Sequence, residues 1–329
     1  MRQLSDKAVI RLRTGAELPD LSGTRYRLLE RVARGGMSVV YAAQDRDLQR
    51  RVALKVLEAP GSQGELAARL MREARVLARL EHPGIVPVHD VGRLPDGRVF
   101  YTMKFVEGQR LDQYIGSLTP ISDRLRLFQR ICDAVAFAHA RGVLHRDLKP
   151  ANVMVGSFGE VLVMDWGLAK ILTGDVETQP GADPASPHDP ANRRNKTTGS
   201  VVTGHGRVMG TPGYMSPEQA RGEVESLDAR SDIFSLGQLL RSLRSERPSD
   251  RSLDAICAKA SAQERAARYA TVQELVADVS RYLDGLAVEA RRENIFEKVG
   301  RFYRRYRFFI LLTAAYLVMR ILLLVLIKP

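Results

Sequence analysis

The order of apolar and polar positions divides the chain into a strand-rich first part and a helix-rich second part. Between Tyr26 and about Met103, short apolar runs separated by turn-forming or polar breaks predict strands. These runs cover residues 27–32, 39–43, 52–57, 86–91 and 99–103. Residues 64–80 predict a helix instead, because their apolar side chains recur at helical spacing until a His-Pro-Gly sequence ends the pattern.

Helical periodicity dominates after Leu111, and the predicted helices cover residues 121–140, 231–243, 253–260 and 272–283. A small sheet-rich lobe followed by a larger helical lobe is an α+β arrangement. Residues 173–207 break the pattern, because they are rich in Pro, Gly, Asp, Asn, Ser and Thr and poor in large apolar side chains. Such a composition buries too little apolar surface to offset its ordering entropy, so we expect a long mobile segment there.

The end of the chain has a different character. Residues 308–327 form an apolar run with a single charge, Arg320. As a helix this run would be about 30 Å long, which matches the hydrocarbon core of a bilayer. Its apolar side chains outweigh the cost of one arginine, about 3 kcal/mol near the centre, so we expect a transmembrane helix in preference to a buried core helix. The arginines between residues 301 and 307 outweigh the single lysine after the run, which places the preceding domain in the cytoplasm.

Composition narrows the classes of protein. Among 329 residues, 45% are hydrophobic and 27% are charged, which is an ordinary globular balance. A net charge of +12 is compatible with a nucleic-acid partner. The basic residues are nevertheless spread along the chain and form no groove-reading motif, so we expect no nucleic-acid partner. Cys132 and Cys257 lie far apart, which argues against a disulfide framework or a zinc site and fits a reducing compartment.

Charged residues in the strand-rich part are suited to holding phosphates. Lys55 ends the strand-like run Val-Ala-Leu-Lys, and Glu73 lies on the helix predicted next. A lysine in that position can reach the α- and β-phosphates of a nucleotide, and a glutamate on the neighbouring helix can hold it by an ion pair. Taken alone, each residue would more often be a solvated surface charge.

The strongest chemical signal is the run HRDLKPAN over residues 145–152. In it, Asp147 can orient an acceptor hydroxyl, Lys149 can neutralise charge on a transferring phosphoryl group, and Asn152 can bring an amide oxygen to a metal ion. A buried strand-like run then ends in Asp165-Trp-Gly, and the Asp165 carboxylate is a hard oxygen ligand suited to Mg²⁺.

On these residues the chain resembles Hanks-type protein kinases of the bacterial Ser/Thr branch, from about residue 26 to residue 285. Residues 210–218 (GTPGYMSPE) match the end of an activation segment, and residues 231–237 (SDIFSLG) match the helix whose aspartate braces the catalytic loop. Arg268 matches the arginine that pairs with the glutamate of the Pro-Glu motif, here Glu218.

The resemblance implies a two-lobed fold, ATP as phosphate donor, and Mg²⁺ held by Asn152 and Asp165, with Mn²⁺ as an alternative metal. It assigns catalytic roles to Asp147, Lys149, Lys55 and Glu73. It places Met103 at the gatekeeper position, residues 104–106 in the hinge that contacts adenine, and residues 33–38 in the phosphate-covering loop. The residues that it assigns to the nucleotide site are Val32, Ala33, Gly35, Gly36, Ser38, Val40, Ala53, Lys55, Met103, Lys104, Phe105, Val106 and Met154.

Three features depart from the family pattern. Ala33 and Ser38 replace glycines of the phosphate-covering loop, so we expect weaker ATP binding or slower turnover without loss of either. Trp166 replaces the phenylalanine of the metal motif and is expected to fill the same apolar slot. Residues 241–252 replace a normally longer region that often helps to dock protein substrates.

The expected organisation is an N-terminal extension over residues 1–25, a small lobe over 26–105 and a large lobe over 106–285. The large lobe contains a long mobile activation segment over 171–209. A basic juxtamembrane segment over 286–307 and the membrane helix over 308–327 follow. We therefore expect a single-pass kinase of the cell membrane whose partners are ATP and protein substrates. Arg146 beside Asp147 implies autophosphorylation of the activation segment, for which dimerisation in trans is one route.

Three other functions fit parts of the sequence. A membrane-tethered pseudokinase scaffold would explain the altered glycine loop and the short region at 241–252, but it would not need Lys55, Asp147, Asn152 and Asp165 together. A kinase for small molecules would not need the activation segment, which shapes a groove for peptides. A nucleic-acid-binding role has the least support.

Overall fold

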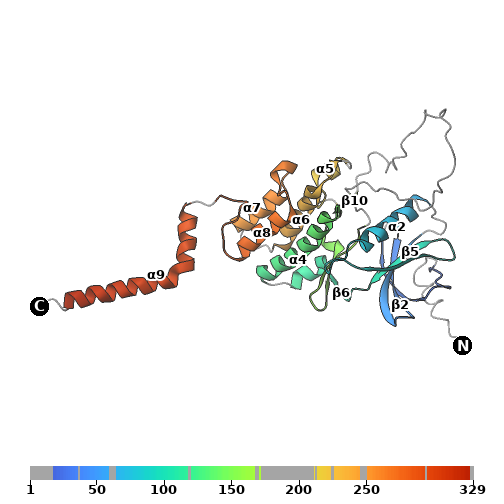
Figure 1. Cartoon of the computed structure of the whole chain (residues 1–329), viewed down its shortest axis with the longest axis horizontal. Helices are drawn as coiled ribbons and strands as arrows, with labels where there is room; N and C mark the ends of the chain where they lie inside the picture. The colour runs from blue at the N-terminus through green and yellow to red at the C-terminus, as the bar shows by residue number, and fades with distance from the viewer. Residues whose placement is uncertain are drawn as a thin grey trace, which may run out of the picture.

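The computed structural model describes residues 18–35, 38–58, 64–117, 120–166, 170–171, 211, 213–223, 226–244, 250–292 and 295–326. Gly36 and nearly all of the predicted activation segment lie outside the described residues, as does residue 327 at the end of the predicted membrane helix. Within the described part, a sheet-rich lobe is followed by a helical lobe, and a long helix extends beyond both (Figure 1).

The small lobe is built on an antiparallel five-stranded sheet in the order β1-β2-β3-β5-β4. Its strands are β1 (Tyr26–Arg34), β2 (Ser38–Asp45), β3 (Arg50–Leu57), β4 (Val88–Arg93) and β5 (Val99–Lys104). Alternate side chains of β5 belong to different hydrophobic clusters, with Tyr101 and Met103 in one and Phe100 in the other. This alternation is what a strand of period two produces when both faces of the sheet are covered.

The helix α2 (Glu65–Ala78) covers one face of this sheet, beside β5 (Figure 1). Its buried apolar side chains include Leu70, Ala74 and Leu77, which recur at the spacing that places them on one side of a helix. Glu73 lies on the same buried side and is only 4% exposed. A buried carboxylate needs a partner, so the side of α2 that packs on the sheet also brings a charge into it.

The large lobe is mainly helical. Its helices are α3 (Leu111–Tyr114), α4 (Ile121–Ala140), α5 (Pro217–Ala220), α6 (Ala229–Leu243), α7 (Arg251–Ala260) and α8 (Val272–Leu283), with 3₁₀ turns η1 (Ile115–Ser117), η2 (Pro150–Asn152) and η4 (Arg265–Ala267). Its short strands are β6 (Gly108–Arg110), β7 (Val143–Leu144), β8 (Val153–Gly156), β9 (Val161–Val163) and β10 (Lys170–Ile171). Helix α4 contacts α8, α6 and the strands β7 and β9, so it forms the centre of this lobe.

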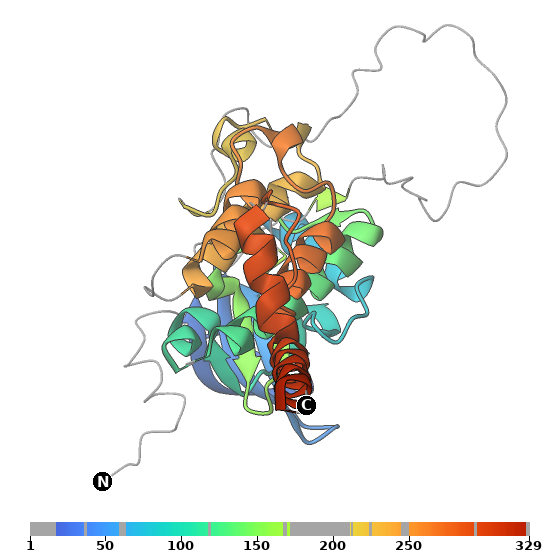
Figure 2. The same ribbon diagram turned by 90° about the vertical axis from the view of Figure 1, so that its left-hand side faces the viewer.

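The last helix, α9 (Ile295–Leu326), leaves the large lobe, bends, and runs away from the rest of the molecule (Figure 1). In Figure 2 the end of this helix points toward the viewer. It starts inside the predicted basic segment 286–307 and continues into the predicted span. The transmembrane helix expected over 308–327 is not confirmed, because no helix in the described part of the chain is long and apolar enough to cross a membrane.

A buried ion pair ties the end of the activation segment to the large lobe. Arg268 donates two hydrogen bonds to Glu218, at 2.7 Å and 2.9 Å, and both side chains are at most 1% exposed. Burial acts to raise the pKa of Glu218, but hydrogen bonds from Arg268 and Ser231 lower that pKa to about 2. This pairing between Glu218 and Arg268 is the one that the resemblance implied.

We predict that Arg268→Ala lowers the free energy of unfolding by about 3–5 kcal/mol, because it leaves the Glu218 carboxylate buried without its cation. Urea denaturation followed by circular dichroism measures this difference. The matched control is Arg221→Ala, because Arg221 forms an ion pair with Glu223 at the exposed surface and its loss should change stability little. Equal effects of the two substitutions would show that burial of the Glu218–Arg268 pair does not stabilise the fold.

Candidate active site

A buried lysine is the point where three parts of the fold meet. Lys55 on β3 donates to Glu73 of α2 at 2.7 Å and to Asp165 at 3.1 Å. The side chains of Lys55 and Glu73 are 12% and 4% exposed, whereas Asp165 is about half exposed. The structure thus places the sequence-predicted lysine between its predicted partner on α2 and the predicted metal ligand that follows β9.

Burial alone would lower the pKa of the Lys55 ammonium, but the neighbouring carboxylates of Glu73 and Asp165 raise that pKa well above its usual value. Burial likewise acts to raise the pKa of Asp165, but the Lys55 ammonium, together with His145 and Lys149, brings that pKa below its usual value. Both groups are therefore charged at neutral pH. A fixed cation and a half-exposed carboxylate side by side are suited to a polyanion that arrives with a divalent metal.

The catalytic loop forms a second cluster. Lys149 donates to Asp147 at 2.7 Å and to Thr211 at 2.6 Å, and the Thr211 hydroxyl lies 3.3 Å from the other Asp147 oxygen. Asn152, in η2, donates from its amide nitrogen to the backbone and side-chain oxygens of Asp147. These contacts fix the Asp147 carboxylate at a defined position, as orienting an acceptor hydroxyl requires.

A buried carboxylate of helix α6 holds the backbone of this loop in place. Asp232 accepts hydrogen bonds from the backbone N–H groups of His145 and Arg146, both at 2.8 Å, and contacts the His139 ring at 2.8 Å. Arg146 has a φ of 70°, a left-handed conformation that is strained for a side chain of this size. The Asp232 carboxylate is therefore what holds the backbone in the shape that presents Asp147.

The tryptophan that replaces phenylalanine in the metal motif fills an apolar slot. Trp166 is 1% exposed, its ring lies 4.6 Å from the ring of His145, and its indole N–H donates to the carbonyl of Val163 at 3.4 Å. The preceding Asp165 has a φ of 59°. Burial of Trp166 directs the carboxylate of Asp165 the other way, toward Lys55.

The residues expected around the adenine base lie in both lobes. Cross-strand neighbours Ala53 and Met103 are each 6% exposed, and Val40 and Phe105 pack against the same hydrophobic cluster. Met154 is on β8 in the large lobe, where it pairs with Leu162. Lys104 is the exposed last residue of β5, and Val106 follows in the connection to β6.

The phosphate-covering loop is described at its two ends. Val32, at 52% exposure, and Ala33 belong to β1, and the N–H of Gly35 donates to the carbonyl of Ser38 at 2.8 Å. This bond joins the two described ends of the loop, and Gly36 lies outside the described residues. The prediction that residues 33–38 cover the phosphates stays a prediction.

Asn152 and Asp165 can hold a divalent metal together with the phosphates of a nucleotide. The amide nitrogen of Asn152 is used by Asp147, which leaves its carbonyl oxygen for a cation, and Asp165 offers a half-exposed carboxylate. In the described part of the chain no three His, Cys, Asp or Glu side chains converge as a complete metal cage. Proteins usually bind Mg²⁺ through one or two oxygen ligands, and phosphate oxygens and water fill the other coordination positions.

Sequence reasoning missed one residue of this site, Tyr101. Its hydroxyl donates to the same Glu73 oxygen that Lys55 contacts, at 2.9 Å. The only sequence signal was its place on β5, where it shares a strand face with Met103.

The model of the protein kinase domain matches residues 26–282, which is most of the chain. The chain belongs to the protein kinase family. Among curated proteins, this kinase is 32% identical over 312 residues to the serine/threonine-protein kinase PknD of Protochlamydia amoebophila, covering 79% of this chain and 30% of the relative. It is 38% identical over 232 residues to PknD of Chlamydia trachomatis serovar L2b, covering 66% of this chain and 24% of that relative. The kinase thus spans less than a third of the length of these relatives.

The fold comparison agrees with the family. The kinase matches the crystal structure of the Mycobacterium tuberculosis PknI kinase domain with a TM-score of 0.56 and 25% identity, covering 78% of this chain and 96% of that one. A variant of the same domain, the C20A_R136N double mutant, matches with a TM-score of 0.57. The two-lobed kinase fold expected from the sequence is therefore confirmed.

We predict that Asp165→Asn weakens Mg²⁺-dependent ATP binding by about 10-fold or more, because it removes the charged oxygen ligand and the anion beside Lys55. Isothermal titration with ATP, at several Mg²⁺ concentrations, measures the change. Asp47→Asn is the control, since Asp47 is an exposed carboxylate in the turn between β2 and β3. Retention of the metal dependence in Asp165→Asn would rule out Asp165 as a metal ligand.

Proposed function

We propose that the chain is an ATP- and Mg²⁺-dependent protein Ser/Thr kinase that transfers the γ-phosphoryl group to hydroxyl side chains. The observation that carries this proposal is that the catalytic loop, with Asp147, Lys149 and Asn152, is joined to the residue before Asp165, which itself contacts Lys55. The link is the Met164 N–H, which donates to the Asn152 carbonyl at 2.8 Å. In this reading Lys55 holds the phosphates, and Asp147 orients the acceptor hydroxyl. Mg²⁺, or Mn²⁺ in its place, neutralises phosphate charge when it is bound.

Contacts of Lys149 support a serine or threonine acceptor. Lys149 bridges Asp147 and the Thr211 hydroxyl, so the lysine charge lies beside the carboxylate that would align the substrate. Lys149 can then stabilise the charge that develops on the transferring phosphoryl group. The resemblance to Ser/Thr kinases rests partly on this lysine and threonine, and the names of the curated relatives agree with it.

Arg146 supports autophosphorylation as the route of activation. Its Nε atom is buried and, among the described residues, has no hydrogen-bond partner. Burial lowers the pKa of this guanidinium, although Asp232 acts to raise it. A phosphorylated residue of the activation segment would supply the missing anionic acceptor, and transfer between two copies of the chain is one way to attach it.

We predict that Asp147→Asn lowers kcat about 10²- to 10⁴-fold while Mg²⁺–ATP binding stays within a few-fold of the unaltered chain. Incorporation of labelled γ-phosphate into the chain itself and into a basic acceptor protein measures kcat, and titration calorimetry measures binding. Asp133→Asn, on α4 of the same lobe, serves as the control substitution. Binding of Mg²⁺–ATP by the unaltered chain without any transfer would contradict the enzyme and support the nucleotide-binding scaffold.

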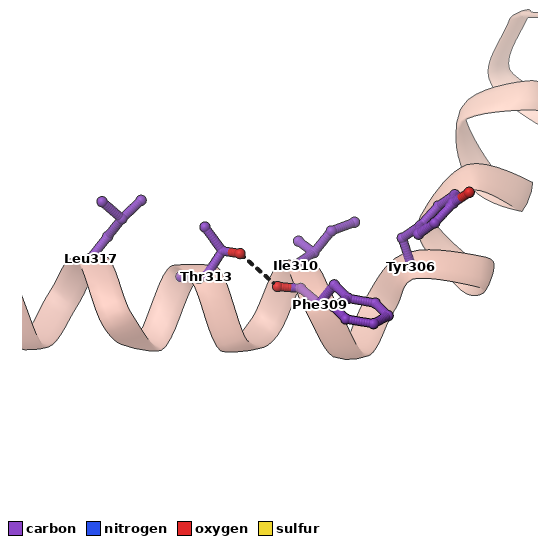
Figure 3. Close-up of a pocket in the computed structure, with 6 residues that line it drawn as sticks. Tyr306, Phe309, Ile310, Thr313 and Leu317 are labelled. Carbon is purple, nitrogen blue, oxygen red and sulfur yellow. Dashed lines mark hydrogen bonds between the residues drawn. The ribbon is translucent and has the colours of Figure 1, made fainter.

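We also propose that α9 attaches the kinase to the cell membrane, with the kinase domain on the cytoplasmic side. Large apolar side chains along this helix are exposed, and Figure 3 displays Phe309, Ile310 and Leu317 among them. Exposed apolar surface of this extent is typical of a membrane or protein contact. The arginines that precede this stretch favour anionic headgroups on the cytoplasmic face.

We predict that the double substitution Leu312→Arg and Val318→Arg moves the chain from the membrane fraction to the supernatant, because each central arginine costs about 2.5–3.5 kcal/mol in a bilayer. Fractionation of expressing cells with alkaline carbonate extraction measures the distribution. The matched control is Leu48→Arg with Val91→Arg, two exposed apolar positions of the small lobe. Recovery of the unaltered chain in the supernatant would contradict membrane attachment.

A further inference from the structure

Tyr101 lies at the centre of the contact between the five-stranded sheet and α2. It is the direct cross-strand neighbour of Lys55, so the two side chains stand next to each other on one face of the sheet. The Lys55 ammonium lies 5.8 Å from the centre of the Tyr101 ring. Helix α2 packs on the same face, and Tyr101 is 1% exposed beneath it.

One oxygen of Glu73 receives hydrogen bonds from both strands. The Oε1 atom accepts from the Lys55 ammonium at 2.7 Å and from the Tyr101 hydroxyl at 2.9 Å. The lysine is shared with Asp165 at 3.1 Å, whereas the hydroxyl of Tyr101 donates to Glu73. The bond from β5 to α2 therefore persists when Lys55 turns toward the phosphates of a nucleotide.

We propose that Tyr101 is a positioning residue, which holds Glu73 and α2 against the sheet and thereby orients Lys55 for the nucleotide. This proposal rests on the function proposed above and adds to it a residue that acts on Lys55 through Glu73. Tyr101 itself does not contact the reacting atoms.

Burial makes the Tyr101 hydroxyl an obligate donor. Burial, more than any neighbour, raises the pKa of the phenol well above its usual value, so the hydroxyl keeps its proton at any working pH. A neutral donor beside a carboxylate gives a charge-assisted hydrogen bond, which is stronger than a bond between two neutral groups. The proton of Tyr101 therefore always points to an acceptor, and Glu73 is the acceptor within reach.

An outward movement of α2 would break this bond at a cost. Such a movement withdraws Glu73 and leaves the Tyr101 hydroxyl buried in an apolar cluster without its acceptor. A buried donor that loses its partner is penalised by its full desolvation. Tyr101 thus disfavours conformations in which α2 has moved outward and taken Glu73 away from Lys55. This effect is present before a nucleotide binds.

The test is Tyr101→Phe in the full chain, which keeps the ring and removes only the hydroxyl. Loss of a hydrogen bond to a charged acceptor predicts about 10-fold weaker Mg²⁺–ATP binding by titration calorimetry. In the transfer assay, KM for ATP should rise about as much, while KM for the acceptor protein stays unchanged. Calorimetry measures ATP binding without phosphoryl transfer. A result against the role of Tyr101 is therefore distinguishable from a result against the proposed kinase activity.

Tyr26→Phe is the matched control. Tyr26 is a buried tyrosine of the same sheet whose hydroxyl donates to Asp90 at 2.9 Å, but it lies in the other hydrophobic cluster, away from α2. Its loss should leave ATP affinity within about twofold, even where both variants unfold at a similarly lowered temperature. Equal loss of ATP affinity in the two variants would show that Tyr101 supports the fold only as Tyr26 does, and it would overturn the proposal.

A double-mutant cycle tests whether Tyr101 acts through Glu73. In a Glu73→Ala background the acceptor is gone, so adding Tyr101→Phe should produce no further loss of ATP affinity. Full additivity of the two losses, or an unchanged affinity in the single Tyr101→Phe variant, would overturn the proposal.

Discussion

The structure depends on one buried cation, Lys55, and on the two carboxylates that surround it. A lysine ammonium inside a lobe is costly unless it is paired, and Glu73 and Asp165 supply the pairing from two separate parts of the chain. One partner is on α2 in the small lobe, and the other follows β9 in the large lobe. The two ion pairs of Lys55 therefore hold α2 against β3 and also connect the small lobe to the large lobe. The sheet, the helix and the metal motif are thereby assembled around the position of a nucleotide phosphate.

In the large lobe, buried anions take the role that the buried Lys55 cation has in the small lobe. Buried carboxylates there accept several N–H or O–H donors and thereby hold irregular backbone in place. Asp232 holds the catalytic loop, Glu218 holds the end of the activation segment, and Asp278 accepts from Tyr269 and from the backbone of residues 289 and 290. Loops with few apolar contacts cannot be fixed by packing, so hydrogen bonds to buried charges perform that task. The same anchoring gives the catalytic groups positions that do not depend on substrate.

Much of this arrangement could be predicted from the sequence, because long amphipathic elements carry a strong periodic signal. The helices predicted over 121–140 and 272–283 match α4 and α8, and the five predicted strands of the small lobe match β1 to β5 within three residues at each end. The two- to four-residue strands β6, β7, β8 and β10 were not predicted, because so few residues show no period. Chemistry-bearing residues were recognised by type and spacing, which is why Lys55, Glu73 and Asp165 could be named in advance.

Other features depend on how elements dock, which no local pattern records. The residues around Tyr101 predict only a buried strand, and the contact of its hydroxyl with Glu73 exists because α2 packs on that face of the sheet. The predicted membrane helix rested on hydropathy over 308–327, and in the described part of the chain no helix is long and apolar enough to span a bilayer.

Hydrogen–deuterium exchange of α2 in the full chain, with and without Mg²⁺–ATP, tests most directly whether the site is assembled before the nucleotide arrives. Peptides covering Glu65–Ala78 report on the docking of this helix, because amides exchange when it detaches from the sheet. We expect these amides to be protected already without nucleotide and to change little when Mg²⁺–ATP binds. Rapid exchange in the free chain that slows strongly with Mg²⁺–ATP would contradict it, since the nucleotide would then be what brings Glu73 to Lys55.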